Sequence, residues 1–356
     1  MFTSCCTKLG AMPLLPLLPL LLHAALGFKL CPSSCLCYES SDLVDCRSRG
    51  LVRVPPSVPH GTWLLDLNGN KLTVVHTRSF MGLWSLKILQ MSNNSIQTLQ
   101  PQSLSSLRFL ERLDLSFNQL HWIPQDFSQG LSSLLELRLD HNLLEHLGPG
   151  SLGELENLRK LDLSYNHIRT IDVRALSSLS RLSLLSLEVN RLDVLKDGLL
   201  NRQQSLEVLL LSHNNISVIE TEALAPLWRL TLLGLRGNQL DRIRFKTFLQ
   251  LQTTSTELQM SLNPWTCDCE LQRVFGKIQR VRHLHVEDYR AIICHAPAQQ
   301  AGSSLASLDS QLCVAETASV LVITITVMLA VIGALVKAEH NHKNKQTASD
   351  SERLEK

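Results

Sequence analysis

An asparagine recurs every 24 residues through the middle of this 356-residue chain. The eight in-phase positions are Asn70, Asn94, Asn118, Asn142, Asn166, Asn190, Asn214 and Asn238. Each one belongs to a pattern of the form L-x-x-L-x-L-x-x-N-x-L, and one copy runs through Leu110, Leu113, Leu115, Asn118 and Leu120. A fixed period in this range is the signature of a solenoid, in which each unit stacks on its neighbours.

The repeating unit predicts a short strand followed by a turn. Its inner leucines alternate with other residues, so one face of the strand is buried and the other is open. The asparagine stands where the chain leaves the strand, and we expect its amide to bond backbone groups of its own coil and of the next coil. A buried backbone group without a partner costs about 1–3 kcal/mol. We therefore interpret the eight asparagines as a structural ladder and not as ligands or catalytic groups.

Residues 62–256 carry this pattern almost without a break, and the pattern resembles the leucine-rich repeat family. The resemblance implies an α/β fold class: a curved solenoid of eight repeats with a parallel sheet on its concave side. Eight strands at a spacing of about 4.8 Å predict a concave face roughly 40 Å long. In the third repeat Phe127 stands one place earlier than its equivalents, which predicts a local change in the convex wall.

The ten cysteines lie towards the two ends of the chain, and none lies between Cys46 and Cys267. This placement indicates disulfide-bonded caps and an oxidising compartment. The formal net charge of +2 gives no sign of a nucleic-acid partner. The sequence contains no nucleophile elbow, phosphate loop or metalloprotease helix, so we expect no enzyme activity, no catalytic or metal site and no cofactor.

Residues 1–27 read as a secretory signal peptide. Lys8 supplies a positive charge, an apolar run follows from Leu14 to Leu26, and small residues at Ala25 and Gly27 suit cleavage after Gly27. An uncleaved membrane anchor is the alternative, and it is disfavoured by the prolines at Pro13, Pro16 and Pro19.

Four cysteines follow in residues 28–61, at Cys31, Cys35, Cys37 and Cys46. Their spacing resembles the N-terminal cysteine cap of extracellular leucine-rich repeat proteins, and the resemblance implies the pairs Cys31–Cys37 and Cys35–Cys46. A zinc site is the alternative for four thiolates, and the signal peptide argues against it.

Residues 257–314 contain a degenerate repeat and a second cysteine cluster. They resemble the C-terminal cysteine cap of the same family, which implies the pairs Cys267–Cys294 and Cys269–Cys313, and we expect Trp265 to cover the last apolar coil. An apolar periodicity predicts a helix over residues 270–284, on Leu271, Val274, Phe275, Ile278 and Val281. Its basic residues predict a site for a sulfated polysaccharide such as heparan sulfate, with a solvated helix face as the alternative: Arg273, Lys277, Arg280 and Arg282.

Residues that flank the buried leucines are expected on the open, concave face. Rings stand just before the asparagine in the middle repeats, at Phe117, His141, Tyr165 and His213. Apolar residues gather in the later repeats, at Leu184, Val208, Leu210 and Leu232. Exposed apolar surface with a charged rim is typical of a protein interface. We predict protein binding through the four aliphatic residues together with Phe117, Arg138, His141 and Tyr165, and ordinary scatter on an open sheet is the alternative.

Two N-glycosylation sequons occur, with acceptors Asn93 and Asn215. Residues 318–336 form an uncharged run that is long enough for one transmembrane helix, and residues 337–356 form a short polar tail. Lysines follow the run, so we predict a type I single-pass protein of the plasma membrane with its N-terminus extracellular.

Capped repeats, one membrane span and a short tail resemble the leucine-rich repeat and transmembrane domain-containing proteins, and the repeats are similar to those of Slit, an axon-guidance ligand. The resemblance implies cell-surface recognition by an adhesion protein or co-receptor, in axon guidance or synapse development. Its candidate partners are Roundabout-type receptors, growth-factor receptors and heparan sulfate. An auxiliary subunit of an ion channel is the alternative function.

Overall fold

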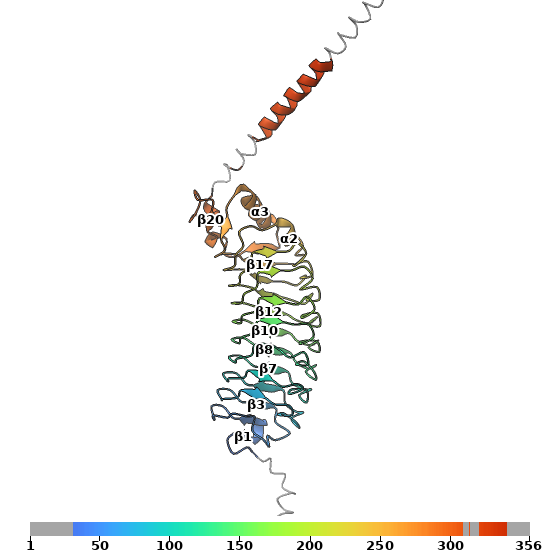
Figure 1. Cartoon of the computed structure of the whole chain (residues 1–356), viewed down its shortest axis with the longest axis vertical. Coiled ribbons are helices and arrows are strands. Elements are labelled where there is room, and N and C mark those ends of the chain that lie inside the picture. The colour runs from blue at the N-terminus through green and yellow to red at the C-terminus, as the bar shows by residue number, and fades with distance from the viewer. Residues whose placement is uncertain (1–30, 309–312, 314–319, 340–356) are drawn as a thin grey trace, which may run out of the picture.

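The computed structural model describes residues 31–308, Cys313 and residues 320–339. Residues 31–308 wind into a solenoid whose strands stack in chain order from β1 to β17, with α2, α3 and β20 at the C-terminal end (Figure 1). The predicted signal peptide, and the tail beyond Glu339, lie outside the described residues.

One sheet of 12 strands runs the length of the solenoid. Its strands β1 and β2 are antiparallel, and every later neighbour pairs parallel. In sheet order they are β1 Leu36–Tyr38, β2 Leu43–Asp45, β3 Leu64–Asp66, β5 Ile88–Gln90, β7 Arg112–Asp114, β8 Glu136–Arg138, β10 Lys160–Asp162, β12 Leu184–Ser186, β14 Val208–Leu210, β16 Leu232–Gly234, β17 Thr256–Gln259 and β19 Leu284–Val286. The sheet is longer than the eight repeats predict, because both caps add strands to it.

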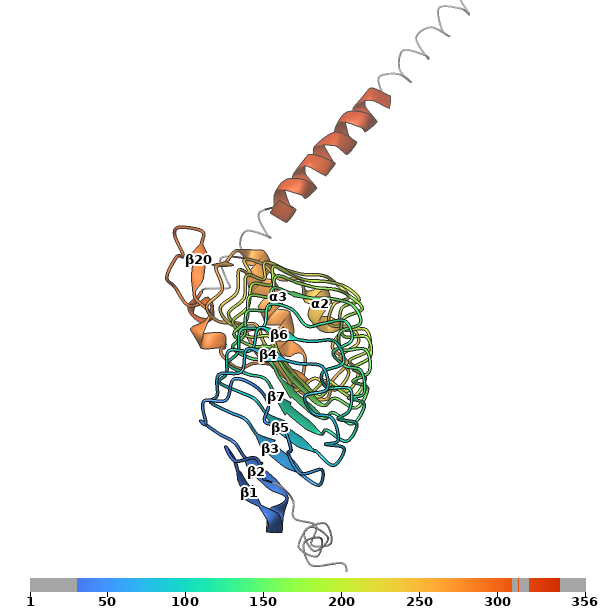
Figure 2. The same ribbon diagram turned by 60° about the horizontal axis from the view of Figure 1, so that its bottom comes forward.

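The opposite wall is made of turns and short strands, and Figure 2 shows β4 and β6 across the solenoid from β3, β5 and β7. The short strands are β4 Val74–Val75, β6 Thr98–Leu99, β9 His146–Leu147, β11 Thr170–Ile171, β13 Val194–Leu195 and β15 Val218–Ile219. The third repeat has no strand at the equivalent residues 122–123, and this is the repeat in which Phe127 stands early. Phe127 still reaches the core, where it is 5% exposed.

The asparagine ladder ties each coil to the coil before it. Nδ2 of Asn142 donates to the carbonyl of Leu139 in its own coil at 3.1 Å and to that of Leu115 in the preceding coil at 2.9 Å. Its Oδ1 accepts from the backbone N–H of Leu120, also in the preceding coil, at 3.0 Å. The prediction that the amide bonds the next coil is therefore wrong, because its bonds between coils go to the preceding coil. Asn263 repeats the geometry and adds a ninth rung to the eight in the sequence pattern.

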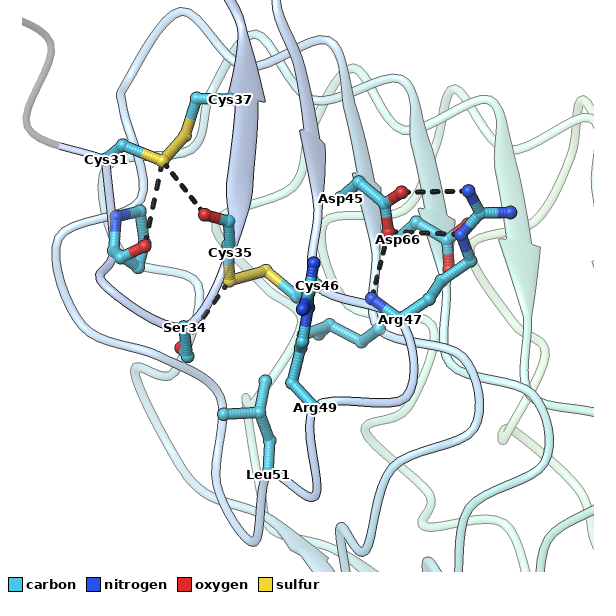
Figure 3. Close-up of a disulfide and its surroundings, with 12 residues drawn as sticks. Cys31, Ser34, Cys35, Cys37, Asp45, Cys46, Arg47, Arg49, Leu51 and Asp66 are labelled. Carbon is cyan, nitrogen blue, oxygen red and sulfur yellow. Dashed lines mark hydrogen bonds and ion pairs between the residues drawn. A yellow bond between two sulfur atoms is a disulfide. The ribbon is translucent and has the colours of Figure 1, made fainter.

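The N-terminal cap closes the first coil with two disulfides, Cys31–Cys37 and Cys35–Cys46 (Figure 3). These are the pairs that the family resemblance implies. Nδ2 of Asn70 donates to the carbonyl of Cys46 at 2.9 Å, so the ladder begins on the cap itself. The strand pair β1–β2 covers the end of the parallel sheet through the pairing of β2 with β3.

The last repeat contains the short helix α2 Phe245–Leu249. The C-terminal cap that follows holds α3 Cys269–Arg280, β18 Trp265–Thr266 and β20 Cys294–Ala296, with the disulfides Cys267–Cys294 and Cys269–Cys313. Trp265 is fully buried, and its ring meets Phe275 of α3 edge-on at 5.6 Å between centroids. Asp268 begins α3 by accepting from the backbone N–H of Leu271 at 2.9 Å. The helix ends at Arg280 and not at residue 284, because Val281 is extended and Leu284–Val286 joins the main sheet as β19.

Three short 3-10 helices complete the described part of the solenoid and its caps: Glu39–Ser41, Tyr289–Ala291 and Leu305–Ser307. Beyond the cap, Val320–Glu339 forms one helix that is long and apolar enough to cross a membrane. It covers most of the predicted span 318–336 and continues three residues past it.

Candidate recognition surface on the concave sheet

Two rows of side chains on the main sheet point away from the core, one on each side of a buried leucine. In β7 the buried Leu113 lies between Arg112, which is exposed, and Asp114, which is half-buried. The parallel pairing is in register, so equivalent residues of successive coils lie side by side. The first row is Arg112, Glu136, Lys160, Leu184, Val208 and Leu232, and the second is Asp114, Arg138, Asp162, Ser186, Leu210 and Gly234.

A third line of residues, which we name the turn column, stands just before the ladder asparagines: Gly69, Asn93, Phe117, His141, Tyr165, Val189, His213 and Gly237. All eight have left-handed backbone, with φ between 51° and 68°. Strand alternation does not place these residues, since each strand has already ended. A side chain other than glycine in this conformation costs about 1–2 kcal/mol, and a β-branched one such as Val189 is an outlier.

Three rings of the turn column form a continuous stack. The centroids of Phe117 and His141 are 4.0 Å apart with their planes 13° from parallel. His141 and Tyr165 follow at 4.2 Å and 11°. We name these three residues the ring stack. The predicted stripe also included His213, which the structure separates from the stack because Val189 stands in the coil between them.

The ring stack borders a cluster of charges on β7 and β8. Nε of Arg138 lies 3.3 Å from Oδ1 of the buried Asp140, and its Nη1 lies 3.7 Å from Oδ2 of Asp114. Nδ1 of His141 lies 3.0 Å from the other oxygen of Asp140. Burial works to lower the pKa of Arg138, but the carboxylates of Asp114 and Asp140 outweigh it and the pKa is raised. Arg138 therefore stays charged and is held by its own sheet.

Four aliphatic side chains occupy the same rows further along, and we name them the apolar patch: Leu184, Val208, Leu210 and Leu232. Leu184, Val208 and Leu232 are direct neighbours across β12, β14 and β16, and each is half-buried. Charged residues follow on both sides, with Lys160 beside Leu184 and Glu257 beside Leu232. The structure thus brings the predicted residues together as a short apolar row with a charged rim.

The remaining predicted residues lie at separate places. Both sequon acceptors, Asn93 and Asn215, are exposed. The four basic residues proposed for polysaccharide are also exposed, on α3 and just after it: Arg273, Lys277, Arg280 and Arg282. Lys277 Nζ sits 5.6 Å from the ring centroid of Phe245. The nearby Arg242 is paired with Asp268 at 3.0 Å, so it adds little free charge to this group.

The left-handed turn column is the feature that sequence reasoning missed. A signal for it was present, because glycine occupies Gly69 and Gly237, and asparagine occupies Asn93. These are the residue types that adopt positive φ most readily.

Comparison with known proteins supports the description of the repeats. The leucine rich repeat model matches residues 64–120, 110–168, 132–192 and 180–240. Leucine-rich repeat-containing protein 3 of Danio rerio is 33% identical over 99 residues, which are 27% of this chain and 37% of that protein. Its Bos taurus counterpart is 39% identical over 94 residues, which are 26% of this chain and 36% of that protein. The chain thus spans little more than a third of the length of these relatives.

Solved structures share the fold over most of the chain. Human 5T4, also named Wnt-activated inhibitory factor 1 or trophoblast glycoprotein, superimposes with a TM-score of 0.61 and 25% identity, covering 80% of this chain and 98% of that one. A chain of the octameric complex of Latrophilin 3, Unc5D and FLRT2, in which FLRT2 is the leucine-rich repeat component, gives 0.56 and 24%, covering 78% and 98%. The in-register coils, the asparagine ladder and the matches over residues 64–240 together establish that this chain belongs to the leucine-rich repeat family.

Proposed function

We propose that this protein is a cell-surface recognition protein, an adhesion protein or co-receptor, that binds an extracellular protein through the concave sheet. The apolar patch carries the proposal. Its side chains lie on an open face, and aliphatic residues at the centre of a charged rim are what a protein interface presents. The complex of FLRT2 with Latrophilin 3 and Unc5D gives a precedent for a leucine-rich repeat solenoid that assembles with other proteins.

The proposal places the solenoid outside the cell and the helix Val320–Glu339 in the plasma membrane, as a type I single-pass arrangement. Four disulfides in the two caps support an oxidising, extracellular location. Within this class we favour axon guidance or synapse development, with Roundabout-type or growth-factor receptors as partners. The protein would then act by binding and not as an enzyme.

Binding tests this proposal directly. Residues 28–316, secreted as a soluble protein, are used to search a panel of cell-surface ectodomains. A variant that carries both Val208→Asp and Leu210→Asp is tested beside it. Charges at the centre of an interface are expected to weaken binding by roughly 30-fold or more, corresponding to about 2 kcal/mol.

The matched control is Val218→Asp, because Val218 is a 50% exposed valine on β15, away from the concave sheet. It should bind like the wild type. A partner that binds the patch variant as tightly as the wild type would place recognition elsewhere on the molecule. Melting curves of the wild type, the patch variant and the Val218→Asp variant are used to check that each protein is folded.

An auxiliary subunit of an ion channel is the second candidate. The observation in its favour is the helix Val320–Glu339, whose apolar residues give it a surface for partners within the membrane. Replacing this helix by an unrelated apolar helix should abolish channel modulation if this candidate is right. It should leave ectodomain binding unchanged if the concave sheet is the functional surface.

Heparan sulfate is a separate proposal for the C-terminal cap, supported by the exposed side chains of Arg273, Lys277, Arg280 and Arg282. Reversal of charge at Arg273 and Lys277 should lower the salt concentration at which the protein elutes from heparin. Reversal at Arg242, which is already paired with Asp268, serves as the control.

A further inference from the structure

The two glycines of the turn column show the direction in which its side chains lean. Gly69 follows Ser48, which has the same left-handed backbone, and Gly237 follows His213. A Cβ placed on Gly69 would lie 2.9 Å from Oγ of Ser48, and one placed on Gly237 would lie 2.6 Å from Nδ1 of His213. At both positions the side chain of one coil occupies the space beside the following coil.

Asn93 stands in this column one coil before the ring stack. Its backbone N–H donates to the carbonyl of Ser116 at 3.1 Å, which fixes Asn93 beside Phe117. A side chain that leans as those of Ser48 and His213 do points from Asn93 towards Phe117 in the next coil. His141 covers one face of that ring at 4.0 Å between centroids, and among the described residues no second ring stacks on the face towards Asn93, which we call the free face.

Asn93 is also an exposed sequon acceptor, in Asn93-Asn94-Ser95. We propose that Asn93 carries an N-linked glycan whose first N-acetylglucosamine packs on the free face of Phe117. The sugar would then form one further layer of the ring stack. This inference rests on the proposed extracellular placement of the solenoid.

The chemistry of the two surfaces fits. Neighbouring strands are about 4.8 Å apart, which leaves room for a sugar ring against an aromatic ring at van der Waals distance. The axial C–H bonds on one face of the sugar carry partial positive charge, and the face of an aromatic ring is negative. Phe117 is 49% exposed, so it has a free surface to offer. The glycan would cover the N-terminal end of the ring stack and leave open the apolar patch, which begins three coils beyond Phe117.

The second sequon provides an internal control. Asn215 is exposed, and its neighbours at the same place in the coils before and after are Arg191 and Gln239. Neither offers a ring, so a glycan at Asn215 has no aromatic surface at the equivalent position.

The test uses the full chain, made in mammalian cells and purified in detergent. Mass spectrometry first measures the occupancy of Asn93 and Asn215. Peptide-N-glycosidase F is then applied to the folded protein, and release is followed at each site through the conversion of asparagine to aspartate. We expect the Asn93 glycan to be released several-fold more slowly than the Asn215 glycan.

Substitutions then identify the contact. Phe117→Leu should remove most of the difference between the two sites. Phe109→Leu, at a 61% exposed phenylalanine outside the turn column, should not change it. Ser95→Ala removes the sequon but keeps Asn93, and should lower the melting temperature of the wild type more than that of the Phe117→Leu variant.

The outcomes separate the two proposals. Glycan at Asn215 with none at Asn93 would overturn this inference and leave the extracellular placement intact. Glycan at neither site would count against both. Equal release rates from wild type and Phe117→Leu, with Asn93 occupied, would show that the sugar does not pack on the ring.

Discussion

Six middle strands of the concave sheet form two halves that share a scaffold and differ in surface. In β7, β8 and β10 the outward residues are charged, and in β12, β14 and β16 they are mainly aliphatic. The ladder beneath them is the same: Nδ2 of Asn142 makes bonds of 2.9 and 3.1 Å to two carbonyls, and Nδ2 of Asn214 makes bonds of 2.8 and 3.0 Å. Scaffold and surface are therefore specified by different positions of the repeat.

The two halves also differ in how far their outward side chains are paired with other side chains of the same molecule. Arg138 forms ion pairs with Asp114 and Asp140. Nε of Arg112 lies 3.9 Å from Oε2 of Glu136. The charged half is therefore largely paired within the sheet. The aliphatic side chains of the apolar patch carry no charge and cannot form ion pairs of this kind. Covering it with a partner would yield roughly 25 cal/mol for each Å² of apolar surface removed from water. The comparison favours the later coils as the place where a partner gains most.

The largest expected effect tests whether the scaffold is uniform. Asn142→Ala in the charged half and Asn214→Ala in the apolar half should each lower the free energy of unfolding by about 3 kcal/mol or more, because each leaves several buried backbone groups without a partner. Chemical denaturation measures both. A large loss for one variant and a small loss for the other would show that the two halves do not depend equally on the ladder.

The next effect lies at the boundary of the halves. Val189 is a β-branched residue with a φ of 51°, so Val189→Asn should raise the free energy of unfolding by about 1 kcal/mol. Val173→Asn is the control, since Val173 is 46% exposed and is not among the residues with positive φ. Equal changes in the two variants would mean that the left-handed backbone at Val189 is not strained.

A smaller effect is expected from the coupling between side chains of the ring stack, which lies in the charged half. A double-mutant cycle on Phe117→Leu and His141→Leu should give a coupling free energy of about 0.5–1.5 kcal/mol, the range for stacked rings. The same cycle on Val189→Ala and His213→Leu should give nearly zero. Similar coupling in both pairs would remove the stack as a distinguishing feature of this half.

The smallest effect concerns acidic residues at the N-terminal edge of the sheet. Burial raises the pKa of Asp66, so its charged form destabilises the fold at neutral pH. Asp66→Asn should melt slightly higher than the wild type at pH 7, and the difference should vanish as the pH falls through the raised pKa. The backbone N–H of Asn68, which donates to Asp66 at 3.0 Å, keeps an acceptor in this variant.

The pKa of Asp45, at the same edge of the sheet, is shifted in the opposite direction to that of Asp66. A hydrogen bond from the Arg47 guanidinium lowers the pKa of Asp45, so its charge stabilises the folded state above the unfolded pKa, and this contribution is lost as the pH falls through the lowered value. Asp45→Asn should therefore melt lower at pH 7. Melting curves between pH 3 and pH 7 compare the two variants, and the same sign for both would contradict the assignment.

The period of 24 residues was sufficient to predict the solenoid and the rows of outward residues, and the resemblance to the leucine-rich repeat family implied the parallel sheet. These features follow from local patterning, because Leu113 and its equivalents can be buried in only one way. The stacking of Phe117, His141 and Tyr165 depends on a left-handed turn after the strand, which alternation alone does not contain. The extra strands at the caps depend on pairing with the end coils, so the helix predicted to reach residue 284 ends at Arg280.

Because the coils are in register, the surface can be changed by the removal or insertion of whole repeats. Removal of residues 167–190, one full period, would leave a ladder asparagine in every remaining coil. It would also bring Tyr165 and His213 into adjacent coils, where the aromatic stack could continue onto a fourth ring. Gain or loss of a single repeat therefore changes which side chains are neighbours without disturbing the hydrogen bonds that hold the coils together.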